Sequence, residues 1–319
     1  MPKSNLLDHS LGLRWSVPAL LVLAALPLFA AWGGDEFYVG LASRILIFAL
    51  AATSLNLILG FGGMVSFGHA AFIGVGAYAV AILMQAGVVS AWVAWPAAML
   101  TSACVALVIG SISLRTQGVY FIMITLAFAQ MLYYLVISLK TYGGDDGMSL
   151  PGRSGIGFGL DLGNDTAFYY LTLALLVAVM VFVARLLNSR FGHALQAIRE
   201  NEPRMTAIGF QVARYKLLAF TIAGALAGLA GAMLANHASF VSPALMQWHQ
   251  SGLLMMMVIL GGVGHLYGGV LGAIVFLLVE EFLSHYTIHW QLGLGAVLLG
   301  VVLLAPNGLT SLLRGRSAR

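Results

Sequence analysis

Eight histidines and a small number of carboxylates are the side chains of this sequence that could do chemistry. Glu281, His285 and His289 are spaced so that one helical face could hold three metal ligands, and this is the nearest approach to a metal site. No histidine pairs with a carboxylate at metal-ligand spacing inside an apolar stretch, and no G-x-x-x-x-G-K-[ST] phosphate loop occurs. We therefore expect no catalytic residues, no metal and no cofactor in this chain. Any ATP and Mg²⁺ chemistry that the protein needs is expected on another chain.

A long polar stretch, Asn188 to Lys216, lies between two apolar regions and carries five basic residues against two acidic ones. Asn201 is a good helix N-cap, Pro203 suits a first helical turn, and Gly209 can end a helix. The stretch therefore predicts one short helix of about two turns, held outside the membrane. A compact, capped, charged helix between two spans is a candidate docking element. The alternative is an ordinary basic loop that only sets topology.

The elements that must position these residues are membrane spans. Of the 319 residues, 61% are hydrophobic and only 8% are charged, whereas a soluble domain has roughly 25% charged residues. Apolar stretches of about 20 residues recur along the chain, as in helical membrane proteins. We predict an all-α polytopic membrane protein with one transmembrane domain over residues 1–319 and about ten transmembrane helices. Eight spans with two re-entrant elements is the alternative. The predicted spans are residues 16–32, 39–60, a third that ends at residue 84, 92–114, 118–139, 167–187, 217–236, 250–264, 270–283 and 288–305.

Two glycine-rich breaks interrupt the apolar pattern, at Gly60–His69 and at Gly261–Gly269. Each contains Gly-Gly followed by Gly-His, which suggests a weak internal repeat. Paired interruptions in corresponding halves point to the transport path of repeat-built transporters. Close helix crossings are the alternative for the breaks, and helix packing is the expected role of Gly224 and Gly228, four residues apart. The predicted path residues are Asn56, Gly62, Gly63, Ser66, His69, Thr125, Gln130, Gly261 and Gly262. For each polar residue in this set, bridging between helices is the alternative.

Ionisable residues deep in the spans mark proton or ion routes, and this sequence has almost none. Arg44 and Glu280 come nearest, but both lie close enough to a span end to reach the interface. This pattern argues against a carrier that uses a carboxylate relay to couple solute movement to protons or sodium.

Charge sorting predicts the orientation of the chain. With ten spans, twelve of the 15 basic residues fall on one side, together with both termini and the loop 188–216, which are therefore expected in the cytoplasm. The glycine-rich loop 140–166 is expected outside, with Asp145 and Asp146. The twelve basic residues are Lys3, Arg14, Arg115, Arg185, Arg190, Arg199, Arg204, Arg214, Lys216, Arg314, Arg316 and Arg319.

Several strings, found in order from about Gly40 to Gly308, together resemble a known family. They are Leu55–Gly60 followed by Gly62–Phe72, Gly118–Phe121, Thr125–Gln130, Gly143–Gly147, Ala197–Glu202, Lys216–Phe220, Ala227–Ala232 and Leu260–Gly264. In number and order these strings are similar to those of LivM-type permeases. Such permeases are membrane subunits of branched-chain amino acid ABC importers in the bacterial inner membrane.

The resemblance implies a set of partners and assigns roles to the loops. LivM-type subunits pair with a LivH-type permease subunit, two ATPase subunits and a periplasmic solute-binding protein, within membrane lipid; no nucleic acid is expected. Asp145 and Asp146 then lie where the binding protein would dock. The loop 188–216 corresponds to the coupling loop, although Pro203 and Arg204 interrupt the Glu-Ala-Ala…Gly pattern of ABC importers. The coupling residues implied are Arg199, Glu200, Asn201, Glu202, Pro203, Arg204, Ala207 and Gly209.

Three functions remain to be weighed. The first is the permease subunit of an ATP-driven importer of branched-chain or related amino acids, although related permeases also carry urea, amides or aromatic acids. The second is a stand-alone secondary carrier for small polar solutes. The third, an integral membrane enzyme, lacks any catalytic constellation in the sequence.

Overall fold

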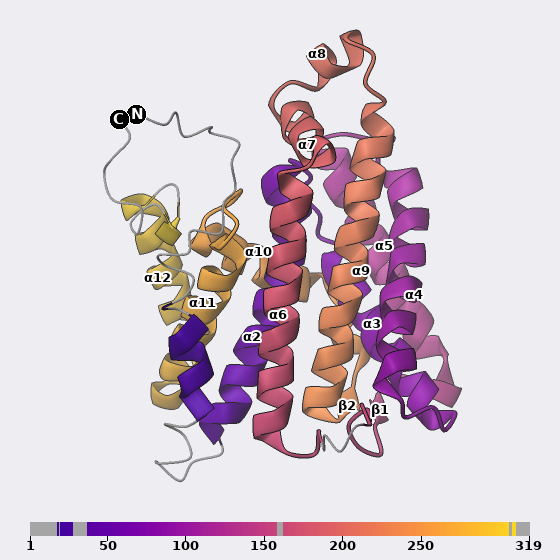
Figure 1. The fold of residues 1–319 in the computed structure, drawn as a ribbon, viewed down its shortest axis with the longest axis vertical. Helices are drawn as coiled ribbons and strands as arrows, with labels where there is room; N and C mark the ends of the chain where they lie inside the picture. Colours follow the sequence, from indigo (N-terminus) through magenta and orange to yellow (C-terminus); the bar gives the residue numbers. More distant parts are fainter. Residues whose placement is uncertain (1–17, 19, 28–36, 158–161, 306–307, 311–319) are drawn as a thin grey trace.

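The chain forms a bundle of long helices with a small two-stranded sheet at one end (Figure 1). The structure is a computed structural model that describes residue 18 and residues 20–27, 37–157, 162–305 and 308–310. The predicted head with Lys3 and Arg14, both ends of the first span and the basic tail lie outside the described residues. Residues 20–27 are helical. The named α-helices are α2 (Phe37–Asn56), α3 (His69–Gln85), α4 (Ala91–Ser113), α5 (Val119–Ser138), α6 (Asp165–Leu187), α7 (Arg190–Glu200), α8 (Glu202–Ala207), α9 (Val212–Ala238), α10 (Trp248–Gly261), α11 (Gly268–Tyr286) and α12 (Trp290–Leu304). The other elements are the π-helical turn η1 (Leu57–Phe61), the 3₁₀ turns η2 (Lys140–Tyr142) and η3 (Pro243–Met246), and the antiparallel strands β1 (Met148–Ser149) and β2 (Phe240–Val241).

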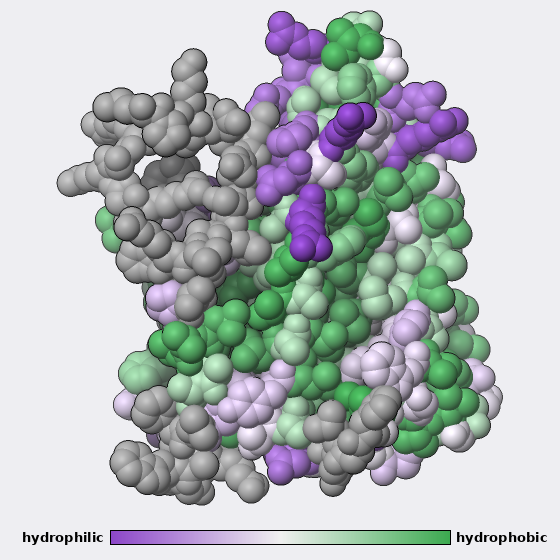
Figure 2. All heavy atoms as spheres, in the orientation of Figure 1, coloured by the Kyte–Doolittle hydropathy of each residue, from purple (hydrophilic) through white to green (hydrophobic). Residues whose placement is uncertain are grey.

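Six of the described helices are long and apolar enough to cross a membrane, and α3 and the apolar part of α12 are shorter. The multi-pass, all-α character is therefore confirmed, while the number of spans stays a prediction. At 17 residues α3 is about 25 Å long, somewhat less than the apolar thickness of a bilayer. Figure 2 shows hydrophilic residues gathered around α7 and α8, with an apolar band below them. We call this the α7–α8 end and the opposite one the strand end.

Most of the described basic residues lie at the α7–α8 end, in line with the predicted charge sorting, and Arg44, Lys140 and Arg153 lie at the strand end. Arg185 lies in the last turn of α6, and α4 ends near α8, since Gln117 just after α4 donates to Glu202. At the strand end, Ser90 just before α4 forms a bridge with Gly155.

Helix α2 forms the centre of the bundle, with 89% of its hydrophobic window buried, against α6, α9, α10 and α11. Beside it, small residues let α3, α4 and α9 approach closely. A Cβ on Gly228 would lie 2.4 Å from Ser102 Oγ of α4, and one on Gly76 would lie 2.2 Å from Gly228 O. A Cβ on Gly224 would lie 2.4 Å from Ala106 Cβ. The predicted packing role of Gly224 and Gly228 is therefore confirmed.

At the strand end, Arg153 fastens the segment after β1 to the bundle. Its guanidinium donates to Asn236 O (3.2 Å) and Leu162 O (2.9 Å), pairs with Asp165 (2.5 Å), and lies 4.6 Å from the centre of the Phe168 ring. A single side chain thus joins the 140–165 region to the start of α6 and the end of α9.

Two local predictions differ from the structure. The loop 188–216 contains two helices, α7 and α8, where one was predicted. Asn201 and Pro203 do begin α8, but the additional helix α7 was missed because its N-cap, Ser189, stands directly against the preceding apolar span. Arg44 and Glu280 form an ion pair between α2 and α11 (3.1 Å), so each has a protein partner in addition to any access to the interface.

Candidate functional site

The two glycine breaks meet at one place, where Asn56 joins them. The side chain of Asn56, in the last turn of α2, donates from Nδ2 to His265 O (2.8 Å) and accepts at Oδ1 from Gly264 N (3.1 Å). Asn56 is 1% exposed. Non-helical backbone at membrane depth must find its hydrogen-bond partners within the protein. The buried amide of Asn56 therefore pairs with one backbone donor and one backbone acceptor of the second break. Asn56 itself lies at the end of α2, the helix that leads into the first break. We call this contact between segments 56–63 and 261–265 the glycine junction.

The junction has no room for side chains. A Cβ on Gly60 would lie 2.5 Å from Gly264 N and 2.9 Å from Gly264 Cα, so the two backbones touch. A Cβ on Gly261 would lie 1.8 Å from Gly268 O. Gly63 and Gly264 have φ of +68° and +77°, which L-residues with a side chain rarely adopt. The glycines at these positions are needed for close approach and for positive φ.

The start of α3 is held by polar side chains from neighbouring helices. Ser251 Oγ of α10 accepts from Ala70 N (2.9 Å), and the His69 ring lies 2.8 Å from Ser54 Oγ of α2. Ser54 comes six residues before Gly60, so α3 begins beside the last turn of α2 and not beyond the end of η1. The segment between α2 and α3 therefore reverses direction and returns into the bundle, as the predicted broken element requires.

Most of the predicted path residues lie at or beside this junction. Ser66, His69 and Thr125 are fully buried, and a Cβ on Gly68 would lie 2.5 Å from Thr125 O of α5. His69 bridges to Ser54 of another helix, which was the alternative weighed for it, whereas Ser66 Oγ accepts from Gly68 N and Thr125 Oγ1 donates to Ile122 O within their own segments. Their assignment to a path stays a prediction.

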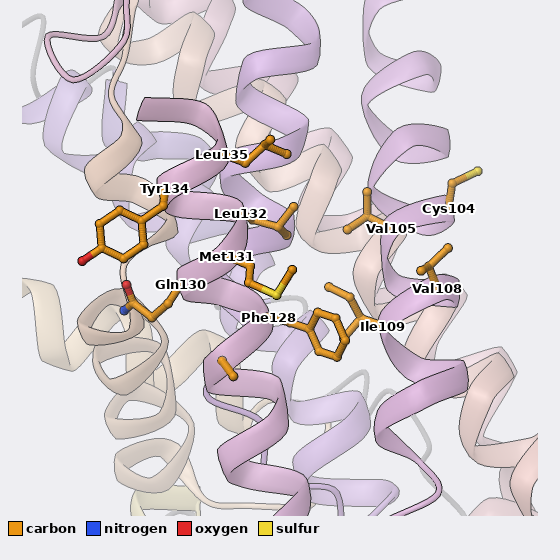
Figure 3. A pocket seen from close by; sticks show the side chains of 11 residues that line it. Cys104, Val105, Val108, Ile109, Phe128, Gln130, Met131, Leu132, Tyr134 and Leu135 are labelled. Carbon is orange, nitrogen blue, oxygen red and sulfur yellow. The ribbon is translucent and has the colours of Figure 1, made fainter. Parts of the chain in front are cut away.

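Gln130 is the exception, because it lies apart from the junction on α5. It lines a cavity of about 920 Å³ between α4 and α5 together with Cys104, Phe128 and Tyr134. Figure 3 shows the side chains of Gln130 and Tyr134 on the side of α5 that points away from α4. Of the six long apolar helices, α5 is the least buried, at 22% of its hydrophobic window. A polar amide and a phenol on such an exposed face favour a protein or water neighbour over lipid.

The α7–α8 unit, residues 190–207 with the start of α9, has a small apolar cluster of its own. Ile198, Met205 and Val212 form a separate apolar core between α7, α8 and α9. Asn201 Oδ1 caps α8 by accepting from Arg204 N (2.9 Å), and Lys216 pairs with Glu202 (2.6 Å).

The far tip of this unit exposes large apolar side chains. Ile208 is 64% exposed and Phe210 is 37% exposed, immediately after α8 and outside the apolar band. Exposed apolar groups surrounded by polar residues mark protein contact sites. Sequence reasoning predicted Arg204, Ala207 and Gly209 beside them but missed these two. Their signal was two large apolar residues inside an otherwise basic loop.

The other predicted coupling residues fall into two groups, those exposed to solvent and those bonded to the rest of the chain. Glu200, Asn201, Pro203, Arg204, Ala207 and Gly209 are exposed. Arg199 instead reaches back to the junction, where its Nη1 donates to Gly60 O. Glu202 is half-buried and bonded to Lys216 and Gln117.

At the strand end, Asp145 and Asp146 form the tip of a tight turn. Gly143, Gly144 and Gly147 around them have φ of +88°, +54° and +82°, and β1 follows directly. Both carboxylates are exposed. Their role as a docking surface stays a prediction.

Comparison with known proteins identifies relatives along most of the chain. Residues 37–306 match the family described as branched-chain amino acid transport system / permease component. The high-affinity branched-chain amino acid transport system permease protein LivM of Escherichia coli is 31% identical, over 93% of this chain and 74% of the relative. LivM of Salmonella typhimurium is 30% identical over the same shares, and LivH of Salmonella typhimurium is 24% identical over 82% of this chain and 90% of the relative. No solved structure matches the chain.

We predict that Asn56→Leu, which keeps the branching and the number of side-chain heavy atoms, destabilises the protein. Gly264 N and His265 O would both lose a buried partner, at a cost of about 1–3 kcal/mol for each unsatisfied group. Thermal unfolding of the detergent-purified protein measures the effect. The matched control is Thr221→Val, since Thr221 bonds only within its own helix, to Leu217 O. Equal melting temperatures for the two variants would contradict the role of Asn56.

Proposed function

Because the chain belongs to the family of branched-chain amino acid transport system permease components, we propose that it is the membrane-spanning permease subunit of an ATP-driven importer. Its solutes are branched-chain or related amino acids, the solutes that the names of its relatives give. Its location is the bacterial inner membrane. The observation that carries this proposal is the family match over residues 37–306, which spans both glycine breaks and the α7–α8 unit.

The α7–α8 end faces the cytoplasm in this proposal, together with both termini, and α8 docks into one of two partner ATPase subunits. The exposed tip at Ile208 and Phe210 supports this, since two apolar side chains in a charged setting fit an apolar cleft in another protein. The energy of ATP hydrolysis is then supplied entirely by the partners, and this chain does no chemistry.

The strand end faces the periplasm and receives the solute-binding protein. The exposed Asp145 and Asp146 offer a negative patch, held in place by the β1–β2 pairing behind them. Such a patch suits a binding protein with a basic rim, because opposite charges steer the encounter.

A second permease subunit of the LivH type covers the exposed face of α5. The support is the low burial of α5 combined with the polar ends of Gln130 and Tyr134 on that face (Figure 3). The solute path then runs between the two subunits, past Gln130, and is closed at the α7–α8 end by the glycine junction.

The importer proposal is tested by uptake into vesicles. We expect the chain reconstituted alone to give no flux of leucine-like amino acids. The complex with its second permease subunit and ATPases should transport only with ATP and the binding protein. The double variant Asp145→Lys with Asp146→Lys should reduce the uptake that the binding protein supports. Flux through the chain alone would instead establish the stand-alone carrier.

The α8 tip gives a second prediction. Ile208→Asp or Phe210→Asp should weaken co-purification of the ATPase subunits by about tenfold or more, because each change places a charge where an apolar anchor is buried on docking. Ile288→Asp is the matched control, since Ile288 is equally apolar, is 93% exposed and lies between α11 and α12. Undiminished co-purification for both tip variants would refute docking through this tip.

The face of α5 gives a third. In a Cys104→Ala background, Tyr134→Cys should cross-link to the second permease subunit in the assembled complex, since Tyr134 is 65% exposed on the face proposed to be covered. Leu299→Cys is the control, exposed to a similar degree on α12, which lies across the bundle (Figure 1). Cross-linking from Leu299→Cys alone would move the subunit interface away from α5.

A further inference from the structure

One side chain of the α7–α8 unit contacts both glycine breaks. Arg199, in the last turn of α7, donates from Nη1 to Gly60 O, and its Cγ lies 3.0 Å from the place that a Cβ on Gly63 would take. The same Nη1 lies 3.0 Å from the corresponding place on Gly264. Glycine at both positions is what lets the arginine lie across the junction.

Gly60 O needs such a donor because of the way α2 ends. The helix widens into η1, Gly63 stops it with φ +68°, and Met64 N donates back to Ile58 O (2.9 Å). Carbonyl groups in the last turn of a helix lack partners within that helix and carry partial negative charge. A guanidinium is well suited to both requirements, because it supplies N–H donors and positive charge together.

The bonds that hold the junction differ in how easily they can break. The Asn56 bonds are fully buried, so separating them leaves two backbone groups unsatisfied. Arg199 is exposed as a whole residue, so its guanidinium returns to water when it leaves Gly60 O. The Arg199 bond is therefore the reversible one.

The α7–α8 unit is held together by contacts of its own. Ile198, Met205 and Val212 and the Lys216–Glu202 pair fix α7, α8 and the start of α9 to one another, and Leu195 of α7 also packs in the main core. A force applied at Ile208 and Phe210 thus reaches Arg199 through packed side chains instead of through a flexible loop.

We propose that Arg199 is the positioning residue through which movement of the α7–α8 unit opens and closes the glycine junction. This inference rests on the proposed function, in which α8 contacts an ATPase and the junction closes the solute path. Arg199 touches neither the solute nor the ATPase. It holds Gly60 against Gly264 while the unit is seated as in this structure, and releases the junction when the unit is displaced.

The test measures opening of the glycine junction in the complete complex. In a Cys104→Ala background, Ser66→Cys places a thiol of nearly the same size in the buried segment between α2 and α3. Its rate of reaction with a membrane-impermeant maleimide, applied at the α7–α8 side of inside-out vesicles, reports opening. We expect slow labelling with Arg199 present and about tenfold faster labelling with Arg199→Gln, the factor that loss of one charge-assisted hydrogen bond corresponds to.

Two matched variants separate positioning from general damage. Arg199→Lys keeps a charged donor and should restore slow labelling in part. Arg190→Gln removes the same charge from the first turn of the same helix, away from the junction, and should leave labelling slow. Unchanged labelling in Arg199→Gln, or equal acceleration in Arg190→Gln, would overturn the inference.

Transport measurements distinguish this inference from the function on which it rests. In Arg199→Gln we expect normal ATPase co-purification and continued ATP hydrolysis, with solute uptake per ATP reduced about tenfold. Labelling requires neither ATP nor solute. ATP-dependent uptake by the unmodified complex together with unchanged labelling in Arg199→Gln would thus overturn the inference alone. Failure of ATP-dependent uptake by the unmodified complex, with accelerated labelling in Arg199→Gln, would overturn the importer function alone.

Discussion

The structure depends on one constraint: a helix that breaks inside a membrane bundle leaves backbone N–H and C=O groups that only the protein can satisfy. Two such breaks occur in this chain, and each is completed by side chains from other segments. Asn56 serves the second break from the end of α2, Ser251 serves the start of α3 from α10, and Arg199 serves Gly60 from α7. Because these partners come from distant parts of the sequence, the breaks fix how α2, α3, α10 and α11 are arranged.

These three side chains, Asn56, Ser251 and Arg199, differ in how easily their hydrogen bonds can be exchanged for bonds to water. Asn56 and Ser251 are fully buried, so their bonds are lost only with the packing around them. Arg199 sits at the rim, where water can replace its bond. The backbones of Gly60 and Gly264 touch directly, and the buried Asn56 side chain bonds the same two segments, so separating them would break the Asn56 bonds as well.

The sequence predicted the features that depend on local pattern. Apolar length gave the long helices, glycine clustering gave both breaks, and Asn201 with Pro203 gave the start of α8. It did not predict that the breaks meet, because Asn56 and Gly264 are 208 residues apart in the sequence and no periodic pattern links them. Helix α7 was missed for a related reason: a charged helix that begins after only two residues beyond an apolar span shows no change of period. The direction of Arg199 could not be predicted, since charge alone does not distinguish an arginine that faces a partner from one that caps a carbonyl.

The few charges at span depth bear on where the energy for transport would enter. Arg44 and Glu280 neutralise each other between α2 and α11, so this pair is committed to holding two helices together. A proton or ion relay needs carboxylates arranged along a route, and Glu280 is paired with Arg44 instead. The glycine junction, for its part, is joined through an amide, a guanidinium and backbone groups. Its guanidinium comes from the α7–α8 unit, whose tip exposes Ile208 and Phe210.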